Sequence, residues 1–284
     1  MAEIQQQAKA ILFRDYHLHK PILLLPNAWD VASARIYEEA GFRAIGTTSA
    51  GLANSLGYPD GQKLPVKELL SMAEKIVRAT KVPVTVDIEA GYGLAISEIL
   101  EMVKGVMDAG AVGINLEDRD SRKGTLTELS IQVSRIEAVR SLAATKGVDL
   151  TINARTDAYY IPDWESSRRF EETLIRADAY VKAGANCIFV PFINELELIR
   201  ALAKAIKAPL NVLAVAGTPS VAQLEEIGVA RVSVGSGPAR AALALLRRIS
   251  QELKEQGTYT LFTENTIPYA EVNALFEHKN GKNH

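Results

Sequence analysis

Short apolar runs alternate with helical stretches along the chain, and this alternation restricts the fold more than any other feature. Eight such runs occur, at 22–25, 44–48, 82–88, 112–116, 150–154, 187–190, 210–214 and 231–234. A glycine, which readily adopts the left-handed conformation that ends a helix, precedes several of them: Gly41, Gly110, Gly184 and Gly228. Eight repeated strand–helix units predict an α/β fold, a (β/α)8 TIM-type barrel.

The composition is typical of one soluble domain that spans residues 1–284. Hydrophobic residues make up 48% of the chain, and 32 basic and 34 acidic residues are interleaved along it. This balance argues against a nucleic-acid or membrane-surface partner and favours a small-molecule ligand. No apolar run approaches the roughly 20 residues of a membrane helix, and a lone Cys187 excludes an intrachain disulfide. We therefore expect a cytoplasmic protein.

Two segments flank the predicted barrel. Apolar residues at helical spacing in 1–20 predict an N-terminal helix that closes the barrel floor or packs beside it. Helices are also predicted at 238–255 and 269–276, and residues 256–284 form a C-terminal arm. This arm contains apolar residues that would make a poor free surface, namely Leu261, Phe262, Tyr269 and Phe276.

Polar residues alternate with apolar ones on three successive predicted strands. Successive side chains of a strand point to opposite faces, so one face of the third strand carries Thr85, Asp87 and Glu89. The matching faces of the next two strands carry Gly113, Asn115 and Glu117, and then Thr151, Asn153 and Arg155. We expect a polar centre at the carboxyl ends of the strands, where barrel active sites lie.

The acids on this face predict a site for a hard cation. Mg2+ prefers oxygen ligands and usually takes one or two carboxylates directly, so Asp87 is the predicted ligand. Glu89 and Glu117 would hold metal-bound waters or fill another position. Nearby cysteines are lacking and the four histidines lie near the termini, which disfavours zinc. Arg155 would pair with a substrate carboxylate or phosphonate, or make an internal ion pair with Glu117 or Asp157.

Five segments between about residues 22 and 240 resemble the isocitrate lyase and phosphoenolpyruvate mutase superfamily, in the same order. They are Leu25-Pro26-Asn27-Ala28-Trp29-Asp30, the segment 47–60, Asp87-x-Glu89-x-Gly91-Tyr92-Gly93, Asn115-Leu116-Glu117-Asp118 and Ala154-Arg155-Thr156-Asp157-Ala158.

The resemblance implies a Mg2+-dependent barrel, with Mn2+ as an alternative ion, that binds a 2-oxo acid or its enolate. Asp87 would hold the metal, and Glu89, Glu117 and Asp60 would act through metal-bound waters. The residues implied in substrate binding are Thr48, Ser49, Arg155 and Asn211. The resemblance also implies a homo-oligomer, a dimer or tetramer, in which the C-terminal arm is exchanged between subunits.

Three departures from the superfamily pattern bear on the reaction. Lyases of this group carry a cysteine on the loop after the fourth strand, whereas the loop at 118–126 has none. Cys187 begins a predicted strand, so it is expected to be a buried small hydrophobe far from the barrel mouth. The sixth strand ends at Phe189 to Phe192, where lyases place an acid and mutases a histidine. Glu89 replaces the commoner aspartate.

These features favour a Mg2+-dependent lyase that cleaves a carbon–carbon bond of a small 2-oxo acid, with oxaloacetate as the test substrate. The predicted catalytic residues are Asp60, Glu117, Lys123 and Arg155, with Lys123 and Arg122 closing on the substrate from the loop. One alternative is a mutase or hydrolase acting on phosphonopyruvate or phosphoenolpyruvate, which would need polar groups for the phosphoryl unit. Another is a non-catalytic 2-oxo acid binder.

Overall fold

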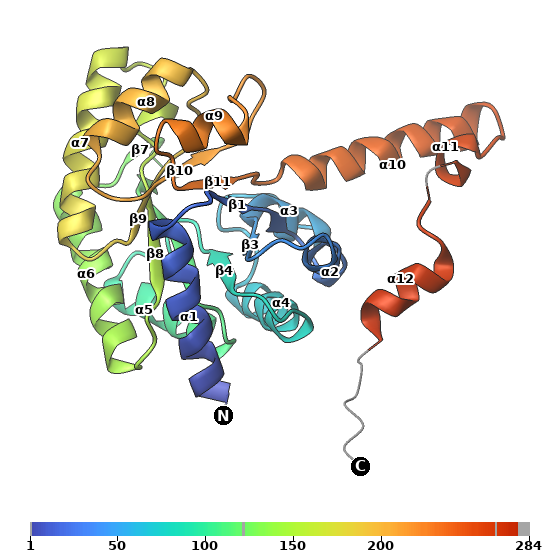
Figure 1. Cartoon of the computed structure of the whole chain (residues 1–284), viewed down its shortest axis with the longest axis horizontal. Coiled ribbons are helices and arrows are strands. Elements are labelled where there is room, and N and C mark those ends of the chain that lie inside the picture. The colour runs from blue at the N-terminus through green and yellow to red at the C-terminus, as the bar shows by residue number, and fades with distance from the viewer. Residues whose placement is uncertain (1, 121–122, 265, 278–284) are drawn as a thin grey trace.

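The computed structural model describes residues 2–120, 123–264 and 266–277 and contains a closed parallel barrel (Figure 1). Its sheet runs in the order β1-β11-β10-β9-β8-β5-β4-β3-β2. β1 (Leu23–Leu25) and β2 (Asn27–Ala28) are separated only by Pro26, and they pair with opposite ends of the sheet. They therefore form one strand that closes the barrel, and the predicted eight-strand fold is confirmed.

The other strands and the helices follow the predicted order. The remaining strands of the barrel are β3 (Ile45–Thr47), β4 (Val84–Asp87), β5 (Gly113–Glu117), β8 (Thr151–Arg155), β9 (Cys187–Val190), β10 (Leu210–Leu213) and β11 (Arg231–Ser233). A separate hairpin after β5 consists of β6 (Arg119–Asp120) and β7 (Thr125–Leu126). The helices are α1 (Ala2–Leu18), α2 (Val31–Glu39), α3 (Ser49–Ser55), α4 (Val66–Ala79), α5 (Ile96–Asp108), α6 (Leu129–Thr145), α7 (Ser166–Lys182), α8 (Leu196–Ala205), α9 (Val221–Glu226), α10 (Gly237–Glu255), α11 (Thr260–Thr263) and α12 (Tyr269–Phe276). The four glycines predicted to end helices all have positive φ, between 85° and 106°.

The strands alternate between an apolar outer face and a polar inner face, as predicted. Ile114 and Ile152 are fully buried in the main core cluster, which also contains residues of the surrounding helices. Inside the barrel, the Asn153 Nδ2 atom donates a hydrogen bond of 2.8 Å to Asn115 Oδ1. The period of two thus places paired polar groups in the barrel interior, where each needs a partner.

Helix α1 closes the amino-terminal end of the barrel. Phe13 is fully buried in a cluster with Leu23, Leu25 and Val112 from the strands. A Cβ atom at Gly113 would lie 2.9 Å from Phe13 Cε1 and 2.8 Å from Thr85 Oγ1, so only glycine fits there. The predicted helix over the barrel floor is therefore confirmed.

His17 on this helix is expected to make the fold sensitive to acid. Its Nδ1 atom donates to the Phe13 carbonyl at 2.8 Å, and its Nε2 atom is buried without a partner among the described residues. Burial, together with the nearby Arg231 guanidinium, lowers the pKa of His17 from 6.5 to about 3. The unfolded chain therefore takes up this proton first, and the contribution of His17 to the free energy of unfolding should fall as the pH drops below 6.5.

We expect the slopes of the wild type and a His17→Leu variant to differ by about 1.4 kcal/mol per pH unit in urea titrations between pH 6.5 and 4.5. The exposed His19→Leu should keep the wild-type slope. Equal slopes in the wild type and His17→Leu would contradict the assignment.

Helix α10 and the predicted arm, which together are called the arm from here on, leave the barrel instead of covering it. In Figure 1, α10 runs outward from the end of β11, with α11 at its far end. The turn between α10 and α11 is ordered by the buried Glu252 carboxylate, which accepts hydrogen bonds from Thr258 Oγ1, Thr260 N and Leu261 N at 2.7 to 2.9 Å. α12 returns to α2, where Arg35 Nε donates to the Leu275 carbonyl. The arm exposes a row of large apolar side chains, including Leu243, Leu246, Leu253, Tyr259, Phe262 and Tyr269.

Within the described parts of the chain, no helix has the length and apolar character required to cross a membrane.

Candidate active site

A cavity of about 440 Å3 opens at the carboxyl ends of the barrel strands. Residues from loops that are far apart in the sequence line it, among them Asn27, Thr48, Ser49, Asp60, Asp87, Asn115, Arg119, Arg155, Tyr160, Phe189, Phe192, Val215 and Arg240. The structure thus brings together five residues predicted from the sequence, namely Thr48, Ser49, Asp60, Asp87 and Arg155.

Asp87 is the last residue of β4 and is fixed by backbone donors. Its Oδ2 atom accepts a hydrogen bond of 3.2 Å from Ser49 N, and its Oδ1 atom accepts one of 3.3 Å from Glu89 N. The Asp87 backbone N donates to Thr47 Oγ1 at 2.9 Å. These contacts join the end of β4 to the end of β3 and hold the carboxylate at the cavity wall.

Arg155, the last residue of β8, forms both internal ion pairs that the sequence left open. Nε and Nη2 donate to the two carboxylate oxygens of Asp157 at 2.7 and 2.9 Å, and Nη1 lies 3.0 Å from Glu117 Oε2. A guanidinium carries five N–H groups, so this bidentate grip still leaves donors for a ligand. Arg155 is therefore held rigidly in the cavity wall.

Glu89 and Glu117 lie behind the cavity wall and are not among its lining residues. Both Glu89 oxygens accept from Gln62 N at 2.9 Å, and Tyr92 OH donates to Oε1 at 3.0 Å. β4 ends at Asp87 and Glu89 has a φ of 50°, so the strand alternation does not extend to it. The Glu89 side chain points instead to the loop that carries Gln62.

Burial raises the pKa values of three carboxyl groups at the site. Burial, with the neighbouring Asp87 and Asp60, raises the pKa of Glu89 to about 7. Burial also raises the pKa of Glu117 well above its ordinary range, opposed by Arg155 and reinforced by Asp157, Asp87 and Glu89. For Asp87, burial outweighs Arg155 and raises the pKa. The charged form of each carboxyl group is therefore disfavoured in the folded protein.

These residues fit a hard divalent cation with one direct protein ligand. Among the described residues, no three acidic, histidine or cysteine side chains form a ready-made metal cluster. Mg2+ does not need one, because it keeps several waters and binds through one or two carboxylates. Asp87 supplies a carboxylate at the cavity wall, and positive charge there would relieve the repulsion among Asp87, Glu89 and Glu117.

An aromatic wall faces the cavity, and it includes Phe189 and Phe192 from the end of the sixth barrel strand. Phe192 packs on Tyr160 with ring centroids 4.8 Å apart, and the Arg119 guanidinium lies 3.7 Å from the Tyr160 ring centroid. Phe192 has a φ of 63°, which is rare for a bulky residue and often marks a functional position. Phe189 and Val215 continue this wall.

Three other lining residues were missed in the sequence: Asn27, Tyr160 and Arg240. Asn27 lies at the carboxyl end of a barrel strand, and Tyr160 and Arg240 follow the ends of β8 and β11; this placement is the signal that would have identified them. Asn27 is the most informative, because its side chain bonds Thr47 O, Val234 N and Gly235 N at 2.8 to 2.9 Å. It thereby joins its own strand to the end of β3 and to the loop after β11.

Three residues singled out from the sequence lie away from the cavity wall. Asn211 is fully buried beneath it, where its Oδ1 accepts from Ser233 Oγ at 3.3 Å. Lys123 is exposed in the β6–β7 turn, and Arg122 lies outside the described residues. Cys187 is buried at the start of β9, as expected, and burial raises the pKa of its thiol to about 12.

The loop that bears β6 and β7 is anchored at its base by Asp118. Its buried carboxylate accepts from Tyr180 OH at 2.7 Å, Arg176 Nη1 at 3.1 Å and Asp157 N at 2.9 Å. The Asp118 carbonyl accepts from Thr127 N at 2.7 Å, which holds the two ends of the loop together. These contacts fix the base of the loop to the barrel.

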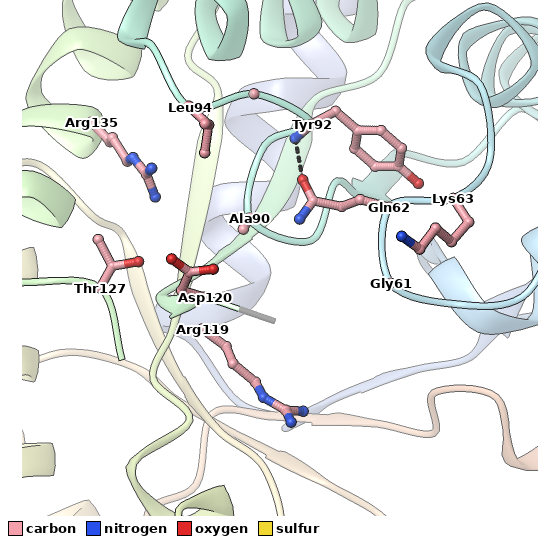
Figure 2. A pocket seen from close by; sticks show the side chains of 11 residues that line it. Gly61, Gln62, Lys63, Ala90, Tyr92, Leu94, Arg119, Asp120, Thr127 and Arg135 are labelled. Carbon is pink, nitrogen blue, oxygen red and sulfur yellow. Dashed lines mark hydrogen bonds between the residues drawn. The ribbon is translucent and has the colours of Figure 1, made fainter. Parts of the chain in front are cut away.

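Figure 2 shows a second cavity, which has a volume of about 240 Å3. Gln62 and Tyr92 lie side by side on its wall, and Figure 2 shows the Arg119 side chain pointing away from Arg135. Arg119 lines both cavities, so it stands at their boundary.

Comparison with known proteins decides the family. A sequence model described as phosphoenolpyruvate phosphomutase matches residues 13–254. The chain belongs to the phosphoenolpyruvate phosphomutase family. It is therefore an enzyme of the isocitrate lyase/phosphoenolpyruvate mutase superfamily, whose members are lyases and mutases.

Relatives in this family include proteins named as lyases and proteins named as phosphonomutases. The 2-methylisocitrate lyase of Aeropyrum pernix is 32% identical over 256 residues, covering 87% of this chain and 80% of that protein. A Burkholderia cenocepacia J2315 crystal structure, provisionally named a phosphonomutase, is 41% identical with a TM-score of 0.82 and covers 86% and 99% of the two chains. The structure of 2,3-dimethylmalate lyase is 25% identical with a TM-score of 0.83 and covers 94% of each. Membership of the family thus leaves the substrate open.

Proposed function

We propose that this enzyme is a Mg2+-dependent lyase that cleaves a carbon–carbon bond of a small 2-oxo acid through an enolate, with oxaloacetate as the first substrate to test. The observation that carries the proposal is that the cavity has a charged part and an aromatic part. Asp87 and Arg155 line the charged part, and Tyr160, Phe189 and Phe192 line the aromatic part.

The polar residues suit a 2-oxo acid. Bound Mg2+ would withdraw electron density from the carboxylate and oxo oxygens and so lower the energy of the enolate. Asp87 would hold this ion, with Asp60 and Glu117 acting through waters. Thr48 and Ser49 would orient the substrate carboxylate, and the remaining N–H groups of Arg155 would contact the oxo acid.

The aromatic wall favours loss of a neutral fragment. In decarboxylation, the electron pair of the breaking carbon–carbon bond moves into the enolate, CO2 leaves, and water returns a proton to the carbon. CO2 is uncharged, so Phe189 and Phe192 can face it without an unpaired charge. A phosphoryl group carries its charge throughout its transfer and would need polar partners.

The proposal is tested with purified protein, Mg2+ or EDTA, and oxaloacetate, phosphonopyruvate or 2-methylisocitrate in turn. We expect metal-dependent release of pyruvate and CO2 from oxaloacetate, above the rate with Mg2+ alone. Phosphate release from phosphonopyruvate would instead support the mutase or hydrolase alternative. Calorimetric binding of a 2-oxo acid without turnover of any of the three would indicate a binder.

We also propose that the C-terminal arm packs against a second copy of the chain in a dimer or tetramer. Its exposed row of leucines and aromatic side chains supports this, because apolar surface of this kind favours burial. Leu246 is 56% exposed near the middle of α10.

A Leu246→Glu variant should weaken assembly at least about 100-fold, since a buried interface would then contain an unpaired charge. Sedimentation equilibrium would report the shift toward the 30.9 kDa chain mass. Lys75→Glu, an exposed change on α4, should leave the assembly intact. A wild-type chain that is monomeric at every concentration would rule the proposal out.

A further inference from the structure

Three residues with long side chains adopt left-handed backbone conformations beside the cavity: Gln62 at φ 59°, Glu89 at φ 50° and Tyr92 at φ 57°. Such conformations are uncommon outside glycine and persist where the surrounding contacts enforce them. These three residues contact one another, and we refer to them as the clasp.

Hydrogen bonds within the clasp join two loops. Gln62 N donates to both Glu89 oxygens at 2.9 Å, and Tyr92 OH donates to Glu89 Oε1 at 3.0 Å. In return, Tyr92 N donates to Gln62 Oε1 at 2.6 Å, the bond drawn in Figure 2. The loop 57–63, which follows α3, is thereby tied to the loop 88–94, which follows β4.

The tied loop carries Asp60, which lines the larger cavity two residues before Gln62. Gly57 and Gly61, at φ 86° and 92°, lie on either side of Asp60, and glycine permits many backbone conformations. Contacts with neighbouring elements fix the loop on both sides of Asp60. Tyr58 OH donates to Glu68 before it, and Gln62 N donates to the buried Glu89 carboxylate after it.

We propose that Glu89 is a positioning residue: through the clasp it fixes the loop 57–63 and thereby holds Asp60 in the wall of the cavity that contains Asp87. The proposal rests on the proposed function, because it gives Asp60 a role beside the metal. It also gives a reason for glutamate at this position. Aspartate is shorter by one carbon–carbon bond, about 1.5 Å, and would not reach Gln62 N with both oxygens.

The first test separates side-chain length from charge. Glu89→Gln keeps the length and one acceptor oxygen, whereas Glu89→Asp keeps the charge and shortens the reach. We expect amide hydrogen exchange at Gln62 and Tyr92 to accelerate about tenfold or more in Glu89→Asp and only about threefold in Glu89→Gln. The reverse order, or no change in either variant, would overturn the clasp.

The second test asks whether the clasp acts through Asp60. Tyr92→Phe removes only the hydroxyl that bonds Glu89, so we expect Mn2+ affinity, measured by calorimetry, to fall about threefold to tenfold. In an Asp60→Asn background the same change should have no further effect. Tyr37→Phe, which removes a hydroxyl on α2 outside both the loop 57–63 and the clasp, is the matched control. Equal losses of affinity with and without Asp60 would overturn the proposal.

The two measurements do not depend on which substrate the enzyme uses. Hydrogen exchange and Mn2+ affinity can be measured even if no 2-oxo acid is turned over, in which case the proposed function fails and the clasp is still tested. Normal turnover with unchanged exchange in Glu89→Asp and Tyr92→Phe would refute the clasp and leave the function standing.

Discussion

Asp87→Asn should lower metal-dependent turnover at least about a thousandfold, equivalent to roughly 4 kcal/mol of transition-state stabilisation. Asparagine keeps the size of the side chain and one oxygen acceptor for Ser49 N or Glu89 N, but it lacks the charge that would hold a divalent cation. Steady-state kinetics with each 2-oxo acid, and calorimetric titration with Mn2+, would measure the loss.

The fold should survive this change. Burial raises the pKa of Asp87, so the charged carboxylate is disfavoured in the fold when no cation is bound. The neutral variant is therefore expected to melt at the same temperature as the metal-free wild type, or higher. Asp108→Asn, which alters an exposed carboxylate paired with Lys104 and Lys146, should leave activity unchanged. Unchanged Mn2+ affinity in Asp87→Asn would remove Asp87 from its assigned role.

Arg155→Lys should lower kcat/KM about a hundredfold to a thousandfold, although it conserves the charge. Lysine cannot reproduce the planar fork that grips Asp157 through two bonds and still reaches Glu117. The ammonium would take a different position, and a small misplacement of a substrate-orienting group is costly. We expect most of the loss in kcat, measured per mole of folded protein.

The structural part of this effect can be separated from the catalytic part. Asp157 is fully buried and would lose donors, so the free energy of unfolding should also fall, by about 1–3 kcal/mol. Arg200→Lys changes an exposed pair with Glu197 and should alter neither quantity. If Arg155→Lys destabilised the fold yet kept kcat/KM within about threefold, Arg155 would be only a structural residue.

The barrel and the central polar residues could be predicted because they depend on local periodicity. The period of two assigned Asn115 and Asn153 to the interior, and the glycines after helices marked the strand–helix repeat. Glu89 shows where this reasoning fails. Its backbone is left-handed just past the end of β4, so its side chain does not follow the alternation of the strand. The hydrogen bond with Gln62, 27 positions away in the sequence, sets the direction of this side chain.

Arg155 and the arm illustrate two further limits of structure prediction from sequence patterns. The sequence could name Glu117 and Asp157 as partners of Arg155, but only the geometry of β5 and β8 places both within reach of one guanidinium. The helices of the arm were predicted from their own pattern. Their path away from the barrel depends on packing that no short-range pattern encodes.

The path of α10 has a consequence for how the cavity can be controlled. Its first turn contributes Arg240 to the cavity wall, while its 19 residues extend roughly 28 Å outward as one rigid rod. A rod of this kind transmits a tilt at one end to the other. A partner that tilted the distal end, around Leu253 and α11, would therefore also move the cationic side chain of Arg240 at the cavity wall.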